Sequence, residues 1–109
     1  MAFDEDLAAR ARSALAGRSD VSERRMFGGL AFMAGGHMAC GVIGEDLVVR
    51  LGEDEADAAL EEPHTRPMGF TGRPMKGYVY VAPAGSGNTA AVDAWIRRAL
   101  AFVATLPPK

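Results

Sequence analysis

The feature that most constrains the fold is a pair of adjacent glycines, Gly35 and Gly36, between two apolar runs with the pattern of β-strands. The run LAFMA at residues 30–34 precedes them, and HMACGVI at residues 37–43 follows. Two glycines at such a position favour a tight hairpin, because both central residues of a type I′ turn need a positive φ. A third run, LVVRL at residues 47–51, follows the turn GED. We therefore expect consecutive strands joined by tight turns, and hence a largely antiparallel sheet.

Helical patterns flank these strands. Residues 4–16 place apolar side chains at three- and four-residue spacing, with acids at the start and arginines near the end, as in an amphipathic helix. The other expected elements are a short acidic helix at 53–62, strands near 67–70 and at 77–82, and a last helix from about Thr89 that Asn88 or Thr89 caps. Gly28-Gly29 is interpreted as a bulge or bend that leads from RRMF into the sheet. This order predicts an α+β two-layer domain, α-β(3)-α-β(2)-α, with a largely antiparallel sheet and helices on one side.

Length and composition indicate one ordinary globular domain. The 109 residues suffice for a single core, and 49% apolar with 24% charged residues is an average composition. No apolar run approaches the roughly 18 residues of a membrane span, and the start of the chain is acidic where a secretory signal carries positive charge. The lone cysteine, Cys40, agrees with a reducing compartment. We expect a single domain over residues 1–109, located in the cytoplasm and not in a membrane.

Charge is divided unevenly along the chain. Residues 1–62 hold six Lys or Arg against thirteen Asp or Glu, a net charge of −7, whereas residues 63–109 hold six against one, a net charge of +5. The basic half can attract an anionic partner, or it can pair internally with the acidic half. Internal pairing is the favoured interpretation, because Arg66, Arg73 and Lys76 are a low density of bases for nucleic-acid binding.

Few residues offer chemistry beyond binding. His37 and Cys40 are three residues apart, and on a strand they point to opposite faces unless a bulge lies between them. His64 would have to supply a further ligand or a base from a loop. Cys40 lies in an apolar run, without the nearby cation that activates a thiol. We therefore expect no metal, no cofactor and no enzymatic activity.

Two glycine-rich stretches invite comparison with phosphate-binding loops. FGGLAFMAGG at residues 27–36 lacks the GxxxxGK[ST] pattern and precedes a strand. GSGN at residues 85–88 precedes the last helix, so its backbone N–H groups could meet an anion. We interpret GSGN as a connector and keep anion binding as the alternative.

The most distinctive stretch is RPMGFTGRPMKGYVYV at residues 66–81. Arg66, Arg73 and Lys76 lie within eleven residues, with aromatic side chains interleaved. One interpretation is a rigid basic loop that binds a carboxylate, a phosphate or an acidic protein surface. In the other, the arginines pair with the acidic helix at 53–62, and methionines fill the edge of the core.

Two long motifs, RRMFGGLAFMAGGHMACGV and RPMGFTGRPMKGYVYV, stand out together with LVVRLG and the final FVATLPPK. Through them the chain resembles the TfoX/Sxy N-terminal domain family of bacteria over about residues 5–108. The resemblance implies a two-layer α-β(3)-α-β(2)-α fold like that of secretion chaperones, and it carries over no catalytic residues. The family is named for regulators of DNA-uptake competence that add a C-terminal helical domain, so a chain ending at Lys109 is expected to be a stand-alone domain. The motif positions are Arg24, Arg25, Met26, Phe27, Gly28 and Gly29, then Arg66, Pro67, Met68, Phe70, Thr71, Gly72, Arg73, Pro74, Met75, Lys76 and Gly77.

These observations predict a non-enzymatic bacterial regulatory or protein-interaction domain. Its expected partner is another protein or a second copy in a homodimer, whereas direct nucleic-acid binding is not expected because the first half is acidic. The expected working surface consists of Arg24, Arg25, Arg66, Arg73, Lys76 and Tyr78. The alternative is a small-anion or nucleotide-binding module that uses the basic loop at residues 66–76. A docking domain should lose its partner, and keep its fold, when Arg66 and Arg73 are replaced by alanine.

Overall fold

Six strands form one open antiparallel sheet in the order β1-β2-β3-β4-β6-β5. The structure, a computed structural model, describes residues 3–26, 28–70 and 73–107, and for residues 26, 68–70 and 73–75 it describes the backbone alone. The strands are β1 (Val21–Met26), β2 (Gly29–Ala34), β3 (His37–Ile43), β4 (Asp46–Arg50), β5 (Thr65–Phe70) and β6 (Arg73–Val81). The described helices are α1 (Glu5–Leu15), α2 (Glu53–Ala59) and α3 (Thr89–Val103), with a 3₁₀ turn, η1 (Pro83–Gly85), before α3.

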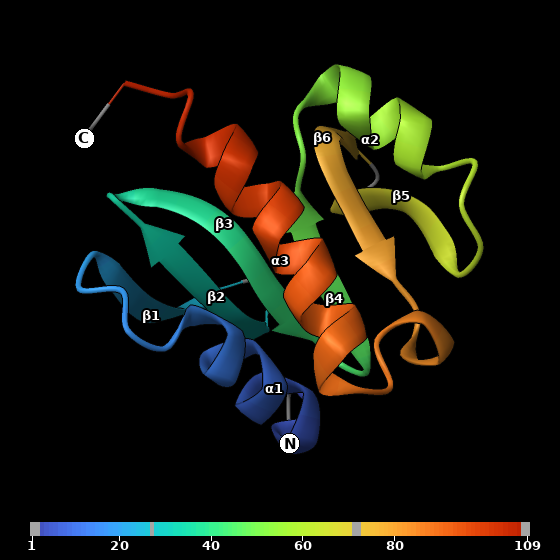
Figure 1. The fold of residues 1–109 in the computed structure, drawn as a ribbon. Coiled ribbons are helices and arrows are strands. Elements are labelled where there is room, and N and C mark those ends of the chain that lie inside the picture. Colours follow the sequence, from blue (N-terminus) through green and yellow to red (C-terminus); the bar gives the residue numbers. More distant parts are fainter. Residues whose placement is uncertain (1–2, 27, 71–72, 108–109) are drawn as a thin grey trace.

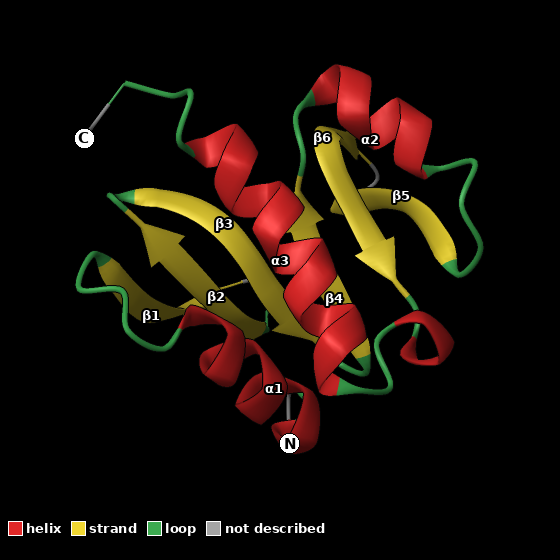
Figure 2. Cartoon of the chain, in the orientation of Figure 1, coloured by secondary structure: helices red, strands yellow, loops and turns green. Residues whose placement is uncertain are grey.

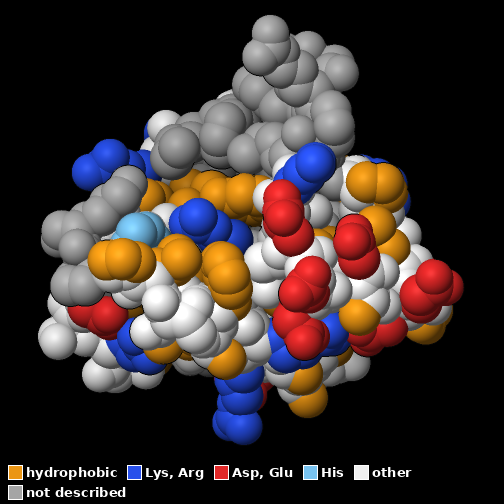
Figure 3. Space-filling model, turned by 90° about the horizontal axis from the view of Figure 1, so that it is seen from above, with side chains coloured by type: hydrophobic (Ala, Val, Ile, Leu, Met, Phe, Trp, Pro, Cys, Tyr) orange, Lys and Arg blue, Asp and Glu red, His pale blue; other side chains and the backbone are white. Residues whose placement is uncertain are grey.

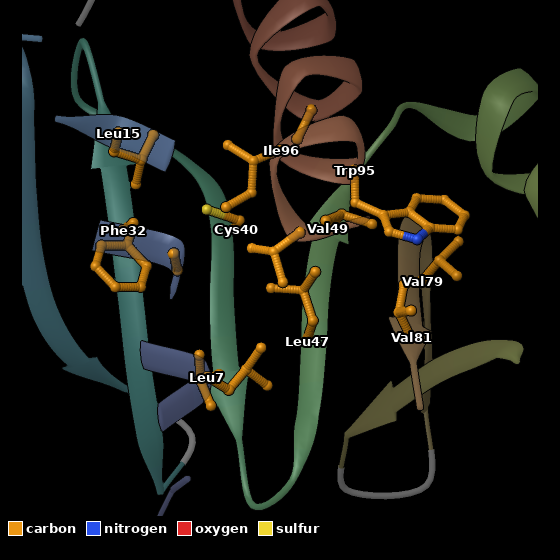
Figure 4. Close-up of a cluster of buried hydrophobic side chains, with 14 of the residues drawn as sticks. Leu7, Leu15, Phe32, Cys40, Leu47, Val49, Val79, Val81, Trp95 and Ile96 are labelled. Atoms are coloured by element: carbon orange, nitrogen blue, oxygen red, sulfur yellow. The ribbon is translucent and has the colours of Figure 1, made fainter. Parts of the chain in front are cut away.

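The three helices pack against the same face of the sheet (Figures 1 and 2). The main core lies between the two layers and includes Leu7 of α1, Ala59 of α2 and Ile96 of α3. From the sheet it takes Phe32, Cys40, Leu47, Val49, Val79 and Val81 (Figure 4). Residues two apart on a strand share a face, which explains why alternate positions of β4 and β6 enter the core. Each such apolar side chain stabilises the fold by about 1.5–3 kcal/mol when fully buried.

The α+β class and the placement of the helices on one side are as predicted, and the sheet has one strand more than predicted. The additional strand, β1, pairs with β2 from Val21↔Ala34 to Met26↔Gly29. The expected bend at Gly28-Gly29 is therefore the turn of a hairpin, where Gly28 takes a φ of +75°. The sequence VSERRM conceals this strand because most of its side chains are polar and exposed at the edge of the sheet, so it lacks apolar alternation.

A bulge in β3 changes the direction of its side chains. The pairing of β3 with β2 shifts by one residue opposite Phe32 and Met33, which leaves Ala39 without a partner on β2. Ala39 and Cys40 are consequently both buried on the helix side of the sheet, whereas Met38 lies on the opposite face.

Gly52 makes a close approach possible where β4 leads into α2. Its φ is +85°, and a Cβ built on it would lie only 2.6 Å from Cε1 of Phe102 in α3. The N–H groups of Leu51 and Gly52 both donate to the carbonyl of Gly77, at 2.8 and 3.2 Å. A glycine at this junction therefore lets β4, β6 and α3 meet without a side chain between them.

Candidate interaction surface

The face of the sheet away from the described helices carries one continuous row of paired residues. From β1 at one edge to β5 at the other, the row consists of Arg24, Ala31, Gly41, Val48, Tyr80 and Arg66. Directly paired residues share a face, and Ala31, Val48 and Tyr80 belong to a cluster separate from the helix-side core. We call this surface the open face. Because neighbouring strands lie about 4.8 Å apart, the arginines at the two ends of the row are separated by on the order of 24 Å.

Apolar side chains fill the middle of the open face. Ala31, Met38 and Val48 are buried there, although none of the described helices covers them. Four half-buried side chains pack against them: Met33, Ile43, Tyr78 and Tyr80. The open face is thus an apolar and aromatic patch with an arginine at each end.

Arg66 is held at the β5 end of the row by contacts with one residue of β4 and one residue of β6. Its Nη1 donates to Oδ1 of Asp46 at 3.2 Å, and its Nη2 donates to Oδ2 of the same carboxylate. The guanidinium also lies 4.5 Å from the centroid of the Tyr80 ring. Hydrogen bonding to Asp46 raises the pKa of the Arg66 guanidinium, which keeps it charged. The Arg66 side chain nevertheless remains 51% exposed, so a carboxylate from a partner can reach it.

Only part of the predicted working surface lies on the open face. Arg24, Arg66 and Tyr78 share this face, but Arg24 and Arg66 are at opposite edges of the sheet. Arg25 lies on the helix side, where its guanidinium is 5.9 Å from the centroid of the Phe3 ring. The predicted residues therefore do not form one compact cluster.

Of the two remaining predicted bases, the structure places only the side chain of Lys76, which is not part of this face. Lys76 lies beside α2, where it lines a hollow of about 210 Å³ with Glu53, Asp54 and Asp57. The side chain of Arg73 falls outside the described residues. Lys76 is therefore next to the acidic helix, whereas the structural interpretation of the basic loop expects the arginines there.

The acids of α2 and the arginines of the open face lie on opposite sides of the sheet. Acidic side chains gather over α2, on the helix side (Figure 3). Two ion pairs join bases from the second half of the chain to acids of the first: Arg98 to Glu62 at 2.9 Å, and Arg66 to Asp46. Internal pairing of the two halves therefore exists, but Arg66 pairs with β4 and not with the acidic helix. The open face keeps the excess positive charge.

Cys40 and His37 are brought to the same side of the sheet by the bulge at Ala39, yet they are held in different environments. Burial raises the pKa of the Cys40 thiol to about 12, so the thiol stays protonated. His37 donates from Nε2 to the carbonyl of Pro107 at 2.5 Å, which ties the end of the chain to the β2–β3 hairpin. Among the described residues, no group of three or more His, Cys, Asp or Glu side chains is placed to hold a metal ion.

The GSGN loop uses its own polar groups internally. The N–H of Gly85 donates to the carbonyl of Ala82 at 2.8 Å, and the Ser86 N–H donates to the carbonyl of Pro83 at 3.2 Å. Asn88 caps α3, because its side chain accepts from the N–H of Ala91 at 2.8 Å. These donors are therefore not directed toward an external anion.

The family follows from comparison with known proteins. The model of the TfoX N-terminal domain matches residues 13–103, which include both arginine-containing motifs. The chain belongs to the TfoX N-terminal domain family. The resemblance found in the two motifs is thus confirmed, and the match supports a competence-regulator-like domain. Searches of curated proteins and of solved structures returned no match.

In the part of this TfoX N-terminal domain that the structure describes, no helix combines the length and the apolar character needed to cross a membrane. Sequence reasoning missed Asp46, Tyr80 and Met38 as members of the open face. The alternation in GYVYV was a usable signal for Tyr80, because it places Tyr78 and Tyr80 on one face of a strand. No local signal pairs Asp46 with Arg66, since their contact depends on the order of the strands.

Proposed function

We propose that this TfoX N-terminal domain is a non-enzymatic regulatory domain that acts in the cytoplasm by docking onto an acidic surface of another protein. The observation that carries the proposal is the open face, where Arg24 and Arg66 end a row of apolar and aromatic side chains. Protein interfaces commonly have an apolar centre with a polar rim, and they are enriched in Tyr, Met and Arg. The open face has this composition.

Charge supports an acidic partner over a basic one. Asp46 is the acid that the described strands place on the open face, and Arg66 already neutralises it. The exposed acids of α2 lie on the helix side, where they would repel an acidic partner. An acidic surface is therefore attracted to one layer of the domain and repelled by the other, which orients the approach.

The titratable groups support binding in preference to catalysis. Asp46 is engaged in charge-assisted hydrogen bonds with Arg66, and the guanidinium covers the Tyr80 ring. The thiol of Cys40 is buried on the helix side, away from the open face. These groups are arranged to present a stable surface, and a protonated thiol is a poor nucleophile.

The experiment compares the open-face variant Arg24→Ala/Arg66→Ala with a control of equal charge change, Arg97→Ala/Arg98→Ala. Arg97 and Arg98 lie on α3 and pair with acids outside the open face. Each immobilised protein captures partners from bacterial lysate, and calorimetry then measures the affinity of each recovered partner. Thermal unfolding checks that all variants are folded.

We expect the open-face variant to bind its partner roughly thirty- to several-hundredfold more weakly, because each of the two interfacial arginines commonly contributes about 1–2 kcal/mol. The control variant should bind within about twofold of the unmodified domain. A partner that binds the open-face variant and the control equally well would contradict the proposal.

A further inference from the structure

The two edges of the sheet differ in what they offer to another strand. β5, at one edge, contains Pro67, and its pairing with β6 shifts between Pro67 and Gly69. Proline lacks an N–H group and a bulge interrupts the ladder, so both features protect an edge from further pairing. β1, at the other edge (Figure 1), has no proline and pairs with β2 over all six residues without a shift. β1 is therefore the edge on which another strand can form regular hydrogen bonds.

Alternate residues of β1 direct their backbone groups away from β2. Just before β1 begins, the N–H of Gly35 donates to the carbonyl of Asp20 at 3.1 Å. In an antiparallel ladder, hydrogen-bonded and non-hydrogen-bonded pairs alternate. Because Asp20 bonds to the residue paired with it, every second residue after it, including Arg24, also bonds to β2. The neighbours of Arg24, Glu23 and Arg25, therefore direct their N–H and C=O groups away from β2. Within the described chain no other backbone group occupies these positions.

The side chains of β1 make this edge basic. Glu23 accepts two hydrogen bonds from Arg12, at 2.9 and 3.0 Å, so its charge is already balanced. Arg24 lies on the open face and Arg25 on the helix side, and the ion pairs of the described residues involve neither of them. Two consecutive acidic residues on an added strand would therefore meet one arginine each, on the two faces of the sheet.

A hollow beside β1 has room for a side chain of the added strand. It has a volume of about 230 Å³ and lies between α1 and β1. Its lining includes the apolar residues Leu15, Val21 and Phe32 and the charged residues Arg12, Arg18 and Glu23. Val21 shares the outward backbone direction of Glu23 and Arg25 by the same alternation. Consider an added antiparallel strand whose two acids lie opposite Arg25 and Arg24. Its residue opposite Val21 comes four positions after the first acid, and the side chain of that residue enters the hollow.

A second copy of the chain fits the edge less well than an acidic segment. The β1 strands of two copies could pair in two antiparallel registers, each of which aligns the outward N–H and C=O groups over five of the six residues of β1. One register places Glu23 opposite its own copy, and the other places Arg24 opposite its own copy. Like charges directly opposite one another destabilise a strand pair. The register centred on Arg24 also places Glu23 opposite Arg25 of the copy, but the two like charges at its centre remain. An acidic segment meets both arginines without such a repulsion.

We infer that an extended acidic segment of a partner protein binds to β1 as an added antiparallel strand. The inference rests on the proposed docking function and specifies the partner: an extended segment with two consecutive acids and an apolar residue that fills the hollow beside Val21. Backbone hydrogen bonds supply a general affinity in this mode, and alternate side chains supply specificity.

The test titrates the isotope-labelled domain with an acetylated and amidated peptide, TEETTVT, and follows amide resonances and amide hydrogen exchange. At saturation, exchange at the N–H groups of Glu23 and Arg25 should slow tenfold or more. The N–H of Arg24, which already bonds to β2, should change little.

A matched pair of variants isolates the backbone contribution. Glu23→Ala and Glu23→Pro remove the same carboxylate, but only proline removes the outward N–H. The Glu23→Pro variant should bind the peptide at least tenfold more weakly than Glu23→Ala. Thermal unfolding establishes whether the proline variant is folded. If it is not folded, hydrogen exchange of the unmodified domain with the peptide decides whether a strand is added to β1.

Four results would overturn the added strand. Shifts at Tyr80 and Arg66 without slowed exchange at Glu23 and Arg25 would leave docking to the open face but exclude the strand. If the folded Glu23→Pro and Glu23→Ala variants bind the peptide with equal affinity, the peptide contacts side chains only and forms no backbone hydrogen bond with residue 23. If exchange at Glu23 and Arg25 becomes slower when the protein concentration is raised without peptide, the edge pairs with a second copy of the chain. If no amide responds, strand addition is wrong, and partner capture alone decides the proposed function.

Discussion

The thiol of Cys40 lies inside the main core, where desolvation raises its pKa from the ordinary 9.0 to about 12. The unfolded chain ionises Cys40 above about pH 9, whereas the folded chain keeps it protonated. The contribution of this thiol to stability is therefore fully present below about pH 9 and is lost as the pH rises toward the folded-state pKa. We expect the free energy of unfolding to fall by up to about 1.4 kcal/mol per pH unit through this residue. Urea denaturation at about pH 8, 9 and 10 measures this slope.

Cys40→Ala is the control for that slope. The variant loses stability at every pH because it leaves a small cavity, but it should lose the part of the alkaline slope that Cys40 causes. An aromatic disulfide reagent gives an independent check, since the folded domain should react far more slowly than the urea-unfolded chain. Rapid reaction of the folded protein at neutral pH would contradict the burial of Cys40.

Among the secondary-structure elements, those with an apolar stripe on a buried face could be predicted from sequence: α1, the β2–β3 hairpin, β4, β6 and α3. β1 could not, because its side chains are mostly exposed and only its pairing with β2 identifies it as a strand. The bulge at Ala39 was also hidden. Counting with period two places His37 and Cys40 on opposite faces, whereas the extra residue brings them to the same side.

The junction of β4, α2 and α3 gives the prediction at this scale. Gly52→Ala should destabilise the domain more than Gly17→Ala. Both positions have a positive φ, of +85° and +90°, so each substitution strains the backbone by about 1–2 kcal/mol. Only at Gly52 would the new Cβ meet the Phe102 ring, whereas nothing lies within 4 Å at Gly17. Overpacking should add about 1–3 kcal/mol to the loss at Gly52.

Urea denaturation of the two glycine variants measures this difference. Adding Gly52→Ala to the Phe102→Ala variant should lower the free energy of unfolding less than adding it to the unmodified domain, because the clash is removed. Equal losses of stability in Gly52→Ala and Gly17→Ala would show that the contact with α3 costs nothing.

In the whole molecule, the surface depends on strand order more than on any local motif. The sequence marks Arg66 as distinctive, but the contacts of Arg66 with Asp46 and Tyr80 exist only because β6 lies between β4 and β5. Arg24 and Arg66 share one face because five directly paired positions, one between each two neighbouring strands, connect them across the sheet. Such long-range registers are set by packing and are not encoded in a short stretch, which explains why the predicted site residues divide between two faces.

The division of charge between the layers leads to a last prediction, for the unmodified domain with two simple probes. Polyglutamate should perturb amide and side-chain resonances of the open face, at Arg24, Tyr80 and Arg66, whereas polylysine should perturb α2. Both effects should weaken strongly between low salt and about 0.15 M salt, where the Debye length is about 8 Å. Arg24→Ala/Arg66→Ala should remove most of the response to polyglutamate and leave the response to polylysine unchanged. Polyglutamate shifts spread evenly over both layers would show that the open face has no particular affinity for acidic chains, since charge alone would then not distinguish it from the rest of the surface.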